Sequence, residues 1–231
     1  MFFLHYIYRD LRPYNRKLAK LAIFAGLVSL FSISHSLQMV GLLTQFAPEI
    51  ALNSLPTEAQ HTLMMDSWLR KGQLALTLSV GCYILWWLYL AFINILALEK
   101  VTERNLKHSA SVMGRVLLGL LSSLKMIRKL WQQSKPLNPE RRLMGKSDPN
   151  EGRWVLPIWW MLLMVANVVK VTAVYRFSHA NDVASLHSAY NWIIAAYVLY
   201  MLFYYFSYRL TVWISGVQMT NYHIVTRPPM V

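Results

Sequence analysis

Residues 155–175 read VLPIWWMLLMVANVVKVTAVY, an apolar and aromatic run that is long enough to cross a membrane. A helix that spans a bilayer needs about 20 mostly apolar residues. The run contains one charged residue, Lys170, which lies five residues before its end. The sequence therefore predicts a transmembrane helix and leaves the question of what a lysine does inside it.

Three further runs have the same character, and they lie at residues 21–46, 74–97 and 190–215. Each must be helical, because lipid offers no partner to an unpaired backbone group. Only 14% of the residues are charged, against about 25% in a typical soluble domain. The 9 Trp and 13 Tyr residues suit the membrane interface. We expect an all-α integral membrane protein with four transmembrane helices, forming one membrane domain over residues 1–231.

The distribution of Lys and Arg predicts the orientation of these helices. Eighteen basic residues lie in the N-terminal arm, between the second and third runs, and in the C-terminal tail, whereas the other two loops hold only Arg70, Lys71 and Arg176. Basic residues favour the cytoplasmic side, so both termini are expected there. This bias explains most of the net charge of +13. A nucleic-acid partner is not expected, because no binding module accompanies the charge.

The long loop between the second and third runs contains an amphipathic stretch at residues 111–133. Its apolar residues repeat with helical spacing, and the basic residues Arg115, Lys125, Arg128 and Lys129 lie beside them. This pattern predicts a helix on the cytoplasmic face of the membrane, with these four residues contacting anionic lipids. A short re-entrant helix is the alternative. A polar connector rich in Pro, Gly and Asn follows at residues 134–153.

Three motifs follow one another in this part of the chain. They are ERNL at residues 103–106, MIRKLWQQS at 126–134 and VLPIWWMLLMVANVV at 155–169. Over roughly residues 74–177, this order resembles a family of bacterial multi-span membrane proteins known only as a domain of unknown function. The resemblance implies a location in the bacterial inner (cytoplasmic) membrane, and it assigns no catalytic residues.

Lys170 admits two interpretations. Its long side chain can reach the membrane interface from the end of its helix, which makes it a tolerated charge. Alternatively, it joins Asn167, which shares its helical face at i, i+3 spacing. Counted along the runs, both residues lie level with His35, Tyr200 and Tyr204. These five residues form a candidate ligand-binding pocket for a lipid, a quinone head group or a proton path, unless their hydrogen bonds only hold helices together.

Other chemical signatures are weak, and we expect no cofactor and no metal ion. His35 has no second histidine at a matching depth, as a haem would need. His179, Asp182 and His187 are possible metal ligands, but a solvated loop is the simpler reading. Recognised catalytic motifs are absent, and so are acidic residues inside the four runs. Arg209 lies near the inner end of the fourth run, from which it can reach the interface.

Small residues form a stripe on the first run, at Ala22, Gly26, Ser29, Ser32 and Ser36. Such stripes let helices approach closely, either within this chain or against a partner. We expect a non-catalytic accessory, assembly or scaffold subunit of an inner-membrane complex. Its partners would be membrane lipids and other subunits or a second copy. The alternative is binding or transport of a small apolar or lipid-like molecule, and an enzyme is a third, less favoured reading.

Overall fold

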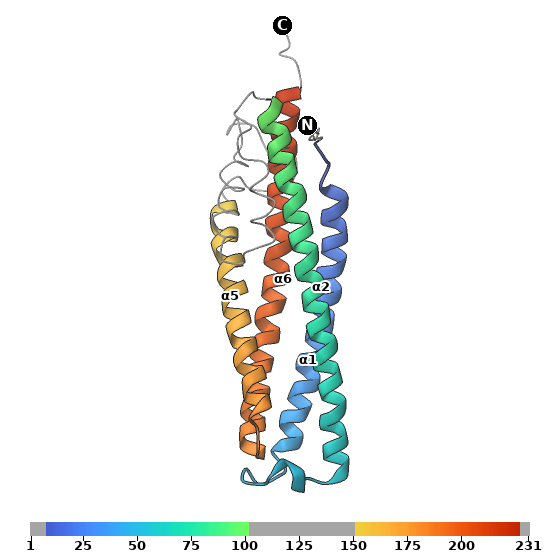
Figure 1. The fold of residues 1–231 in the computed structure, drawn as a ribbon, viewed down its shortest axis with the longest axis vertical. Coiled ribbons are helices and arrows are strands. Elements are labelled where there is room, and N and C mark those ends of the chain that lie inside the picture. Colours follow the sequence, from blue (N-terminus) through green and yellow to red (C-terminus); the bar gives the residue numbers. More distant parts are fainter. Residues whose placement is uncertain (1–7, 102–150, 227–231) are drawn as a thin grey trace, which may run out of the picture. The chain divides into compact units, whose positions relative to one another are not determined.

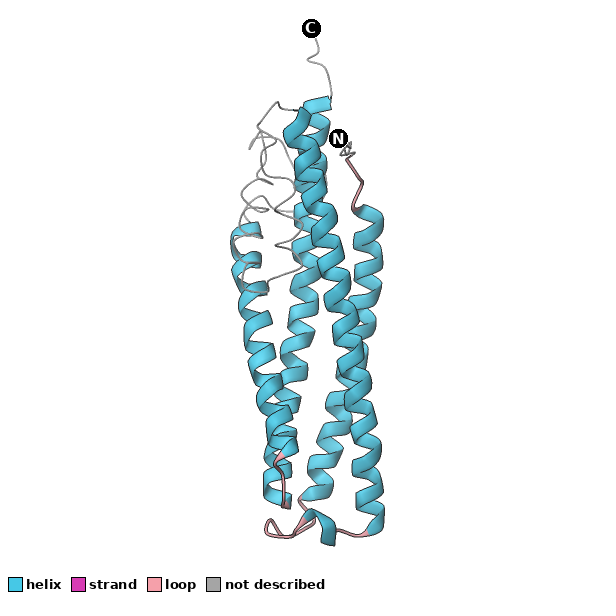
Figure 2. Cartoon of the chain, in the orientation of Figure 1, coloured by secondary structure: helices cyan, strands magenta, loops and turns pink. Residues whose placement is uncertain are grey.

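A computed structural model describes residues 8–101 and 151–226 (Figure 1). Within these residues the chain is helical apart from short connections, as Figure 2 shows, and the one bridge of β type joins Ala51 to Asp182. The long helices are α1 (Arg12–Leu43), α2 (Thr57–Val101), α5 (Glu151–Ser178) and α6 (Val183–Thr226), with a short 3-10 helix, η1 (Leu52–Ser54), before α2. All four are long and apolar enough to cross a membrane. The predicted all-α, multi-pass class is therefore confirmed for the described residues.

The helices are longer than the apolar runs, which corrects two predictions. The stretch of α2 that qualifies as a membrane span reaches from Thr57 to Ile95. Arg70 and Lys71, expected in a loop, therefore lie in this helix, and Arg176 lies in the last turn of α5. Acidic residues were expected to be absent from the spans, but Asp66 lies inside this one and is 1% exposed.

The predicted cytoplasmic elements fall mostly outside the described residues. These include the amphipathic helix at 111–133, its four basic residues, and the connector up to residue 150. The last part of the predicted connector, residues 151–153, belongs to the first turn of α5.

Contacts divide the chain into two compact units, and each of the four long helices contributes to both. Among the described residues, unit 1 comprises residues 8–19, 81–101, 151–158 and 207–226, and unit 2 comprises Lys20–Val80 and Trp159–Phe206.

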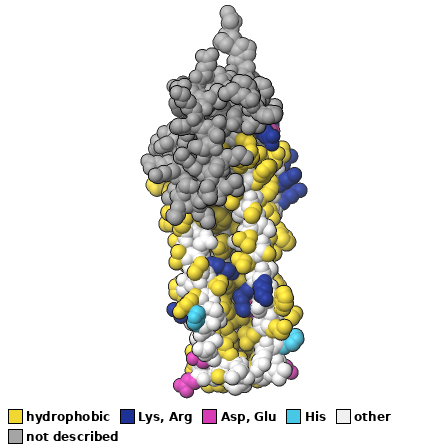
Figure 3. All heavy atoms as spheres, viewed as in Figure 1, with side chains coloured by type: hydrophobic (Ala, Val, Ile, Leu, Met, Phe, Trp, Pro, Cys, Tyr) yellow, Lys and Arg dark blue, Asp and Glu magenta, His cyan; other side chains and the backbone are white. Residues whose placement is uncertain are grey.

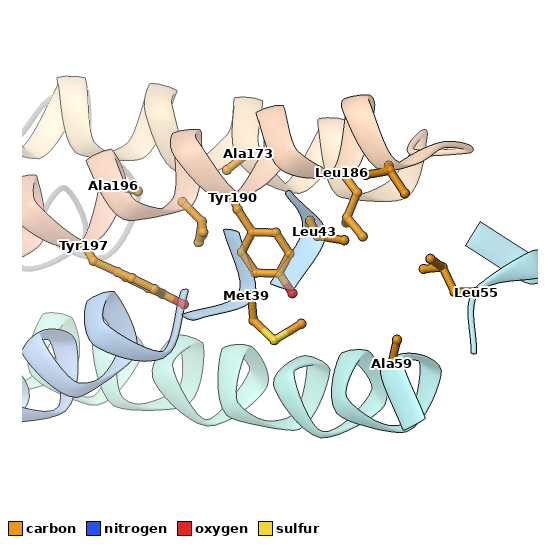
Figure 4. Packing of buried hydrophobic residues seen from close by; sticks show 11 residues of the cluster. Met39, Leu43, Leu55, Ala59, Ala173, Leu186, Tyr190, Ala196 and Tyr197 are labelled. Atoms are coloured by element: carbon orange, nitrogen blue, oxygen red, sulfur yellow. The ribbon is translucent and has the colours of Figure 1, made fainter. Parts of the chain in front are cut away.

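Unit 2 contains the two short connections and an apolar core beside them. The core residues come from all four helices and from the first connection, and Figure 4 shows them packed around Tyr190. They are Met39, Leu43, Leu55, Ala59, Ala173, Val183, Leu186, Tyr190, Ile193, Ala196 and Tyr197. Asp182 precedes α6, and its Oδ1 accepts the N–H of Ser185 at 2.7 Å, which is the geometry of a helix N-cap. Hydrogen bonds from the Ser185 side chain and backbone hold the pKa of Asp182 below its usual range.

Unit 1 is held together by buried amides. Asn94 of α2 accepts the backbone N–H of Arg9 at 2.8 Å and donates to the carbonyl of Arg9, also at 2.8 Å. Asn15 of α1 accepts the indole N–H of Trp87 at 2.7 Å and donates to Ser215 Oγ at 2.6 Å. Polar groups buried between helices need such partners, so these bonds fix how α1, α2 and α6 pack in this unit.

Large apolar side chains remain exposed on the helix surfaces. On α1 they include Ile23, Phe24, Leu27, Leu30 and Phe31, each more than half exposed. Figure 3 shows such side chains in yellow along the described part of the chain. A surface of this kind suits contact with lipid or with another membrane helix.

Candidate functional site

A buried carboxylate lies at the centre of the candidate site, in unit 2. The side chain of Asp66, on α2, accepts a hydrogen bond from the Tyr190 hydroxyl of α6 at 2.6 Å. One helical turn along α2, the guanidinium of Arg70 forms an ion pair with the same carboxylate. Arg70 also donates to the Tyr190 hydroxyl at 3.3 Å. The carboxylate therefore has both charge compensation and hydrogen bonds, which a buried charge requires.

Two further side chains complete the surroundings of this ion pair. On the α1 side, His35 Nε2 lies 3.3 Å from Asp66 Oδ1. That contact lacks the alignment of a hydrogen bond, and His35 Nε2 has no other hydrogen-bond partner among the described residues. On the α5 side, the guanidinium of Arg70 lies 4.0 Å from the centre of the Phe177 ring. Arg70 thus gains a cation–π contact in addition to its salt bridge. Helices α1, α2, α5 and α6 all contribute to this cluster, which we call the Asp66 cluster (His35, Asp66, Arg70, Phe177 and Tyr190).

The structure links the five predicted pocket residues in smaller groups. Asn167 Oδ1 accepts the Tyr200 hydroxyl at 3.2 Å, and the rings of Tyr200 and Tyr204 stack with their centres 6.2 Å apart. Tyr204 shares a hydrogen bond with Thr77 Oγ1 at 3.1 Å. Asn167, Tyr200 and Tyr204 are therefore brought together, whereas His35 contacts the Asp66 cluster. A common pocket of all five residues stays a prediction.

Lys170 contacts Tyr197, a tyrosine outside the five residues of the predicted pocket. Its Nζ lies 4.9 Å from the centre of the Tyr197 ring. Tyr197 is 1% exposed, whereas Lys170 is half-buried. An ammonium over an aromatic face is stabilised by the ring quadrupole, by about 0.5–1 kcal/mol at exposed sites and about 2 kcal/mol when desolvated.

Lys170→Met is expected to change the free energy of unfolding by no more than about 1 kcal/mol, because two effects oppose each other. Methionine loses the cation–π contact, but it also removes a charge from apolar surroundings and keeps a similar stem. Thermal unfolding in detergent measures the change. Lys71→Met is the matched control, because Lys71 is exposed and its Nζ lies 4.4 Å from the Trp68 ring. A loss above about 3 kcal/mol for Lys170→Met alone would assign the lysine to an essential buried site.

The three possible metal ligands contact separate neighbours. His179 Nδ1 lies 2.9 Å from the carbonyl of Tyr175, Asp182 caps α6, and His187 Nδ1 lies 3.5 Å from Asn191 Nδ2 within α6. Across residues 8–101 and 151–226, no three His, Cys, Asp or Glu side chains form a group that could hold a metal ion.

Sequence reasoning missed the carboxylate of this site and its basic partner. Asp66 and Arg70 precede the second apolar run, so they were assigned to a loop. Their i, i+4 spacing and the seven-residue spacing from Asp66 to Gln73 indicate a helix that continues backwards from the run. Tyr190 was recognised only as the first residue of the fourth run and not as a site residue. It lies seven residues before Tyr197, on the same face of the helix.

No family model matches the chain, and comparison with curated proteins and with solved structures finds no similar chain. The resemblance to the bacterial family of unknown function stays a prediction.

Proposed function

We propose that the chain is a non-catalytic accessory or assembly subunit of a bacterial inner-membrane complex and that α2 binds the partner subunit. One observation carries this proposal. Gly72, Ala75 and Ser79 form a stripe of small residues on α2, and all three are exposed. A Cβ atom built on Gly72 would meet nothing within 4 Å. The stripe is therefore open to another helix.

Small residues favour association of membrane helices for a physical reason. Lipid tails are as apolar as the helix surface, so association depends on close van der Waals packing of the two backbones. The stripe predicted on the first run shows the same principle inside this chain. There Ser29, Ser32 and Ser36 are buried, and Ser29 Oγ accepts a hydrogen bond from Gln73 of α2 at 2.7 Å. The stripe on α2 has no such neighbour among the described residues, which supports a partner from another chain.

The proposal includes an orientation with both termini in the cytoplasm. The two connections at residues 44–56 and 179–182 contain no Lys or Arg. Arg70, Lys71 and Arg176, which were counted on that side, belong to helices. Of the eighteen basic residues assigned to the other segments, six also belong to helices, which leaves twelve outside the described helices; the six are Arg12, Arg16, Lys17, Lys20, Lys100 and Arg153. The contrast of twelve with none supports cytoplasmic termini through the positive-inside bias.

The test compares two glycine variants extracted from membranes in native lipid discs. Gly72→Leu is expected to reduce the amount of the copurified partner at least tenfold, because leucine keeps the two backbones apart. Gly41→Leu is the matched control, since Gly41 is also exposed and also has open space around its Cβ, but lies on α1. A benzophenone attached to Cys82, which is exposed and lies three residues after Ser79, should crosslink the wild-type chain to the same partner.

Two results would contradict this proposal. One is a wild-type chain that is a lone monomer in native lipid discs and gives no crosslink from Cys82. The other is equal recovery of the partner with Gly72→Leu and with Gly41→Leu, which would show that the stripe is not the contact.

A second candidate function is binding of a small lipid-like molecule, such as a lipid or a quinone, beside α5. It is favoured by the polar face that Asn167 and Lys170 form within the apolar run of α5, next to Tyr197 and Tyr200. Asn167 is exposed although its neighbours in the sequence are apolar. Native mass spectrometry would show a bound molecule that is retained by the wild-type chain and lost from Asn167→Leu. Equal retention by both chains would remove this candidate.

A further inference from the structure

Helices α2 and α6 are joined in unit 2 by two hydrogen bonds at different levels, one buried and one partly buried. The first joins Asp66 to Tyr190 at 2.6 Å, and the second joins Thr77 to Tyr204 at 3.1 Å. Residue numbers increase in the same direction along both helices, so α2 and α6 are parallel here. Seven residues correspond to two turns of a helix, which returns the side chain to nearly the same face.

Gln73 and Tyr197 occupy the level between these two bonds. Each lies seven residues after a member of the first bond, on the same helix. Both side chains are buried, with exposures of 2% and 1%. Figure 4 shows that the rings of Tyr190 and Tyr197 leave α6 on the same side. Within the described residues, Gln73 Oε1 and the Tyr197 hydroxyl have no hydrogen-bond partner.

The orientation of the Gln73 amide is determined by its neighbour. Ser29 Oγ donates its only proton to the carbonyl of Ala25 at 2.8 Å, so it can only accept from Gln73. The NH2 group of Gln73 must therefore point at Ser29, and Oε1 cannot exchange places with it. Rotating the amide would not relieve the unpaired oxygen.

Two unpaired buried polar groups at one level need an explanation, because a buried polar atom without a hydrogen bond destabilises the folded state. A bound group that accepts from the Tyr197 hydroxyl and donates to Gln73 Oε1 would satisfy both. A cation is disfavoured, since Arg70 and Lys170 on the neighbouring turns provide two positive charges against the single carboxylate of Asp66. A neutral hydroxyl group meets both requirements, and water is the smallest such group.

We propose that unit 2 binds a buried water molecule between Gln73 of α2 and Tyr197 of α6. The water supplies the third hydrogen-bonded level between the two helices, in line with the Asp66–Tyr190 and Thr77–Tyr204 bonds. The contact between α2 and α6 in this unit is therefore hydrated at its middle level.

Solid-state NMR with magnetisation transferred from water tests this site directly, using the full chain labelled with 13C-tyrosine in lipid bilayers. The signals of Tyr197 and Tyr204 are assigned by their loss in Tyr197→Phe and Tyr204→Phe. Tyr204 is the matched control, because it is equally buried, lies on the same helix and has a protein partner in Thr77. Transfer from water is expected to reach Tyr197 at least twofold faster than Tyr204. Transfer that is no faster to Tyr197 would overturn the water site, including the case in which a lipid hydroxyl occupies it.

The thermal midpoint of Tyr197→Phe provides an independent readout. It changes in opposite directions depending on whether the Tyr197 hydroxyl binds water or is unpaired. If water is bound, the variant loses a hydrogen bond, and its midpoint should fall by about 2–4 °C, as should that of Tyr204→Phe. If the hydroxyl is unpaired, its removal relieves a buried polar group, and the midpoint should rise. A rise for Tyr197→Phe together with a fall for Tyr204→Phe would overturn the proposal.

Discussion

Replacing Asp66 with leucine is expected to lower the free energy of unfolding by about 3–5 kcal/mol, because it leaves the buried guanidinium of Arg70 without its counter-charge. The Tyr190 hydroxyl also loses the carboxylate that accepts its hydrogen bond at 2.6 Å. Reversible unfolding in detergent, followed by circular dichroism, measures the loss. If the variant fails to accumulate in membranes, the loss of stability is large enough to prevent folding, which also agrees with the prediction.

The double variant Asp66→Leu/Arg70→Leu is the control for this prediction. Removing both charges leaves no unpaired ion, and an apolar pair of similar size is often tolerated in place of a buried salt bridge. We expect the double variant to recover more than half of the stability lost by Asp66→Leu. If Asp66→Leu changes stability by less than about 1 kcal/mol, the carboxylate is not buried as the structure shows.

The second large effect is expected in unit 1, where Asn94→Leu should cost roughly 2–4 kcal/mol. The Asn94 amide makes three hydrogen bonds, two with the backbone of Arg9 and one in which it donates to Gln218 Oε1 at 3.3 Å. Each contributes about 1 kcal/mol, and the groups left buried without a partner add to the loss. Thermal unfolding measures the change in stability.

A protease assay follows the local consequence of the same substitution. Because Asn94 holds the backbone of Arg9, Asn94→Leu should speed tryptic cleavage after Arg9 in the folded protein several-fold. Asn191→Leu is the control, since Asn191 is an exposed amide on α6. Equal cleavage rates for the two variants would show that Asn94 does not anchor the N-terminal segment.

The four helices could be predicted because a spanning helix needs only length and apolar composition. The ends of the helices could not be predicted, because the added turns contain polar residues that are buried against partners on other helices. On a hydropathy scale, the polar residues Asn15, Asp66 and Gln73 fall outside the apolar runs. Each is nevertheless less than 8% exposed in the structure. Burial of a polar group depends on its partner, and these partners are more than 40 residues away in the sequence.

The candidate site shows the same limit. Asn167 and Tyr200 were predicted to lie together from their depth along two helices, and they share a hydrogen bond of 3.2 Å. Depth alone, however, does not determine which face of a helix meets which neighbour. In the structure His35 contacts Asp66, and Lys170 contacts Tyr197. Comparing the depth of residues along the runs could not identify these two partners.

Labelling of introduced cysteines in intact cells tests the central claim, that four helices cross the membrane and that both short connections lie on its outer side. In a Cys82→Ser background, cysteines at Asn53 and Asn181 lie in the two connections, and a cysteine at Glu140 lies in the long basic segment. A membrane-impermeant maleimide is expected to label positions 53 and 181 from outside, and position 140 only after the membrane is opened. Labelling of position 140 from outside, or of only one of the two connections, would contradict the four-helix arrangement.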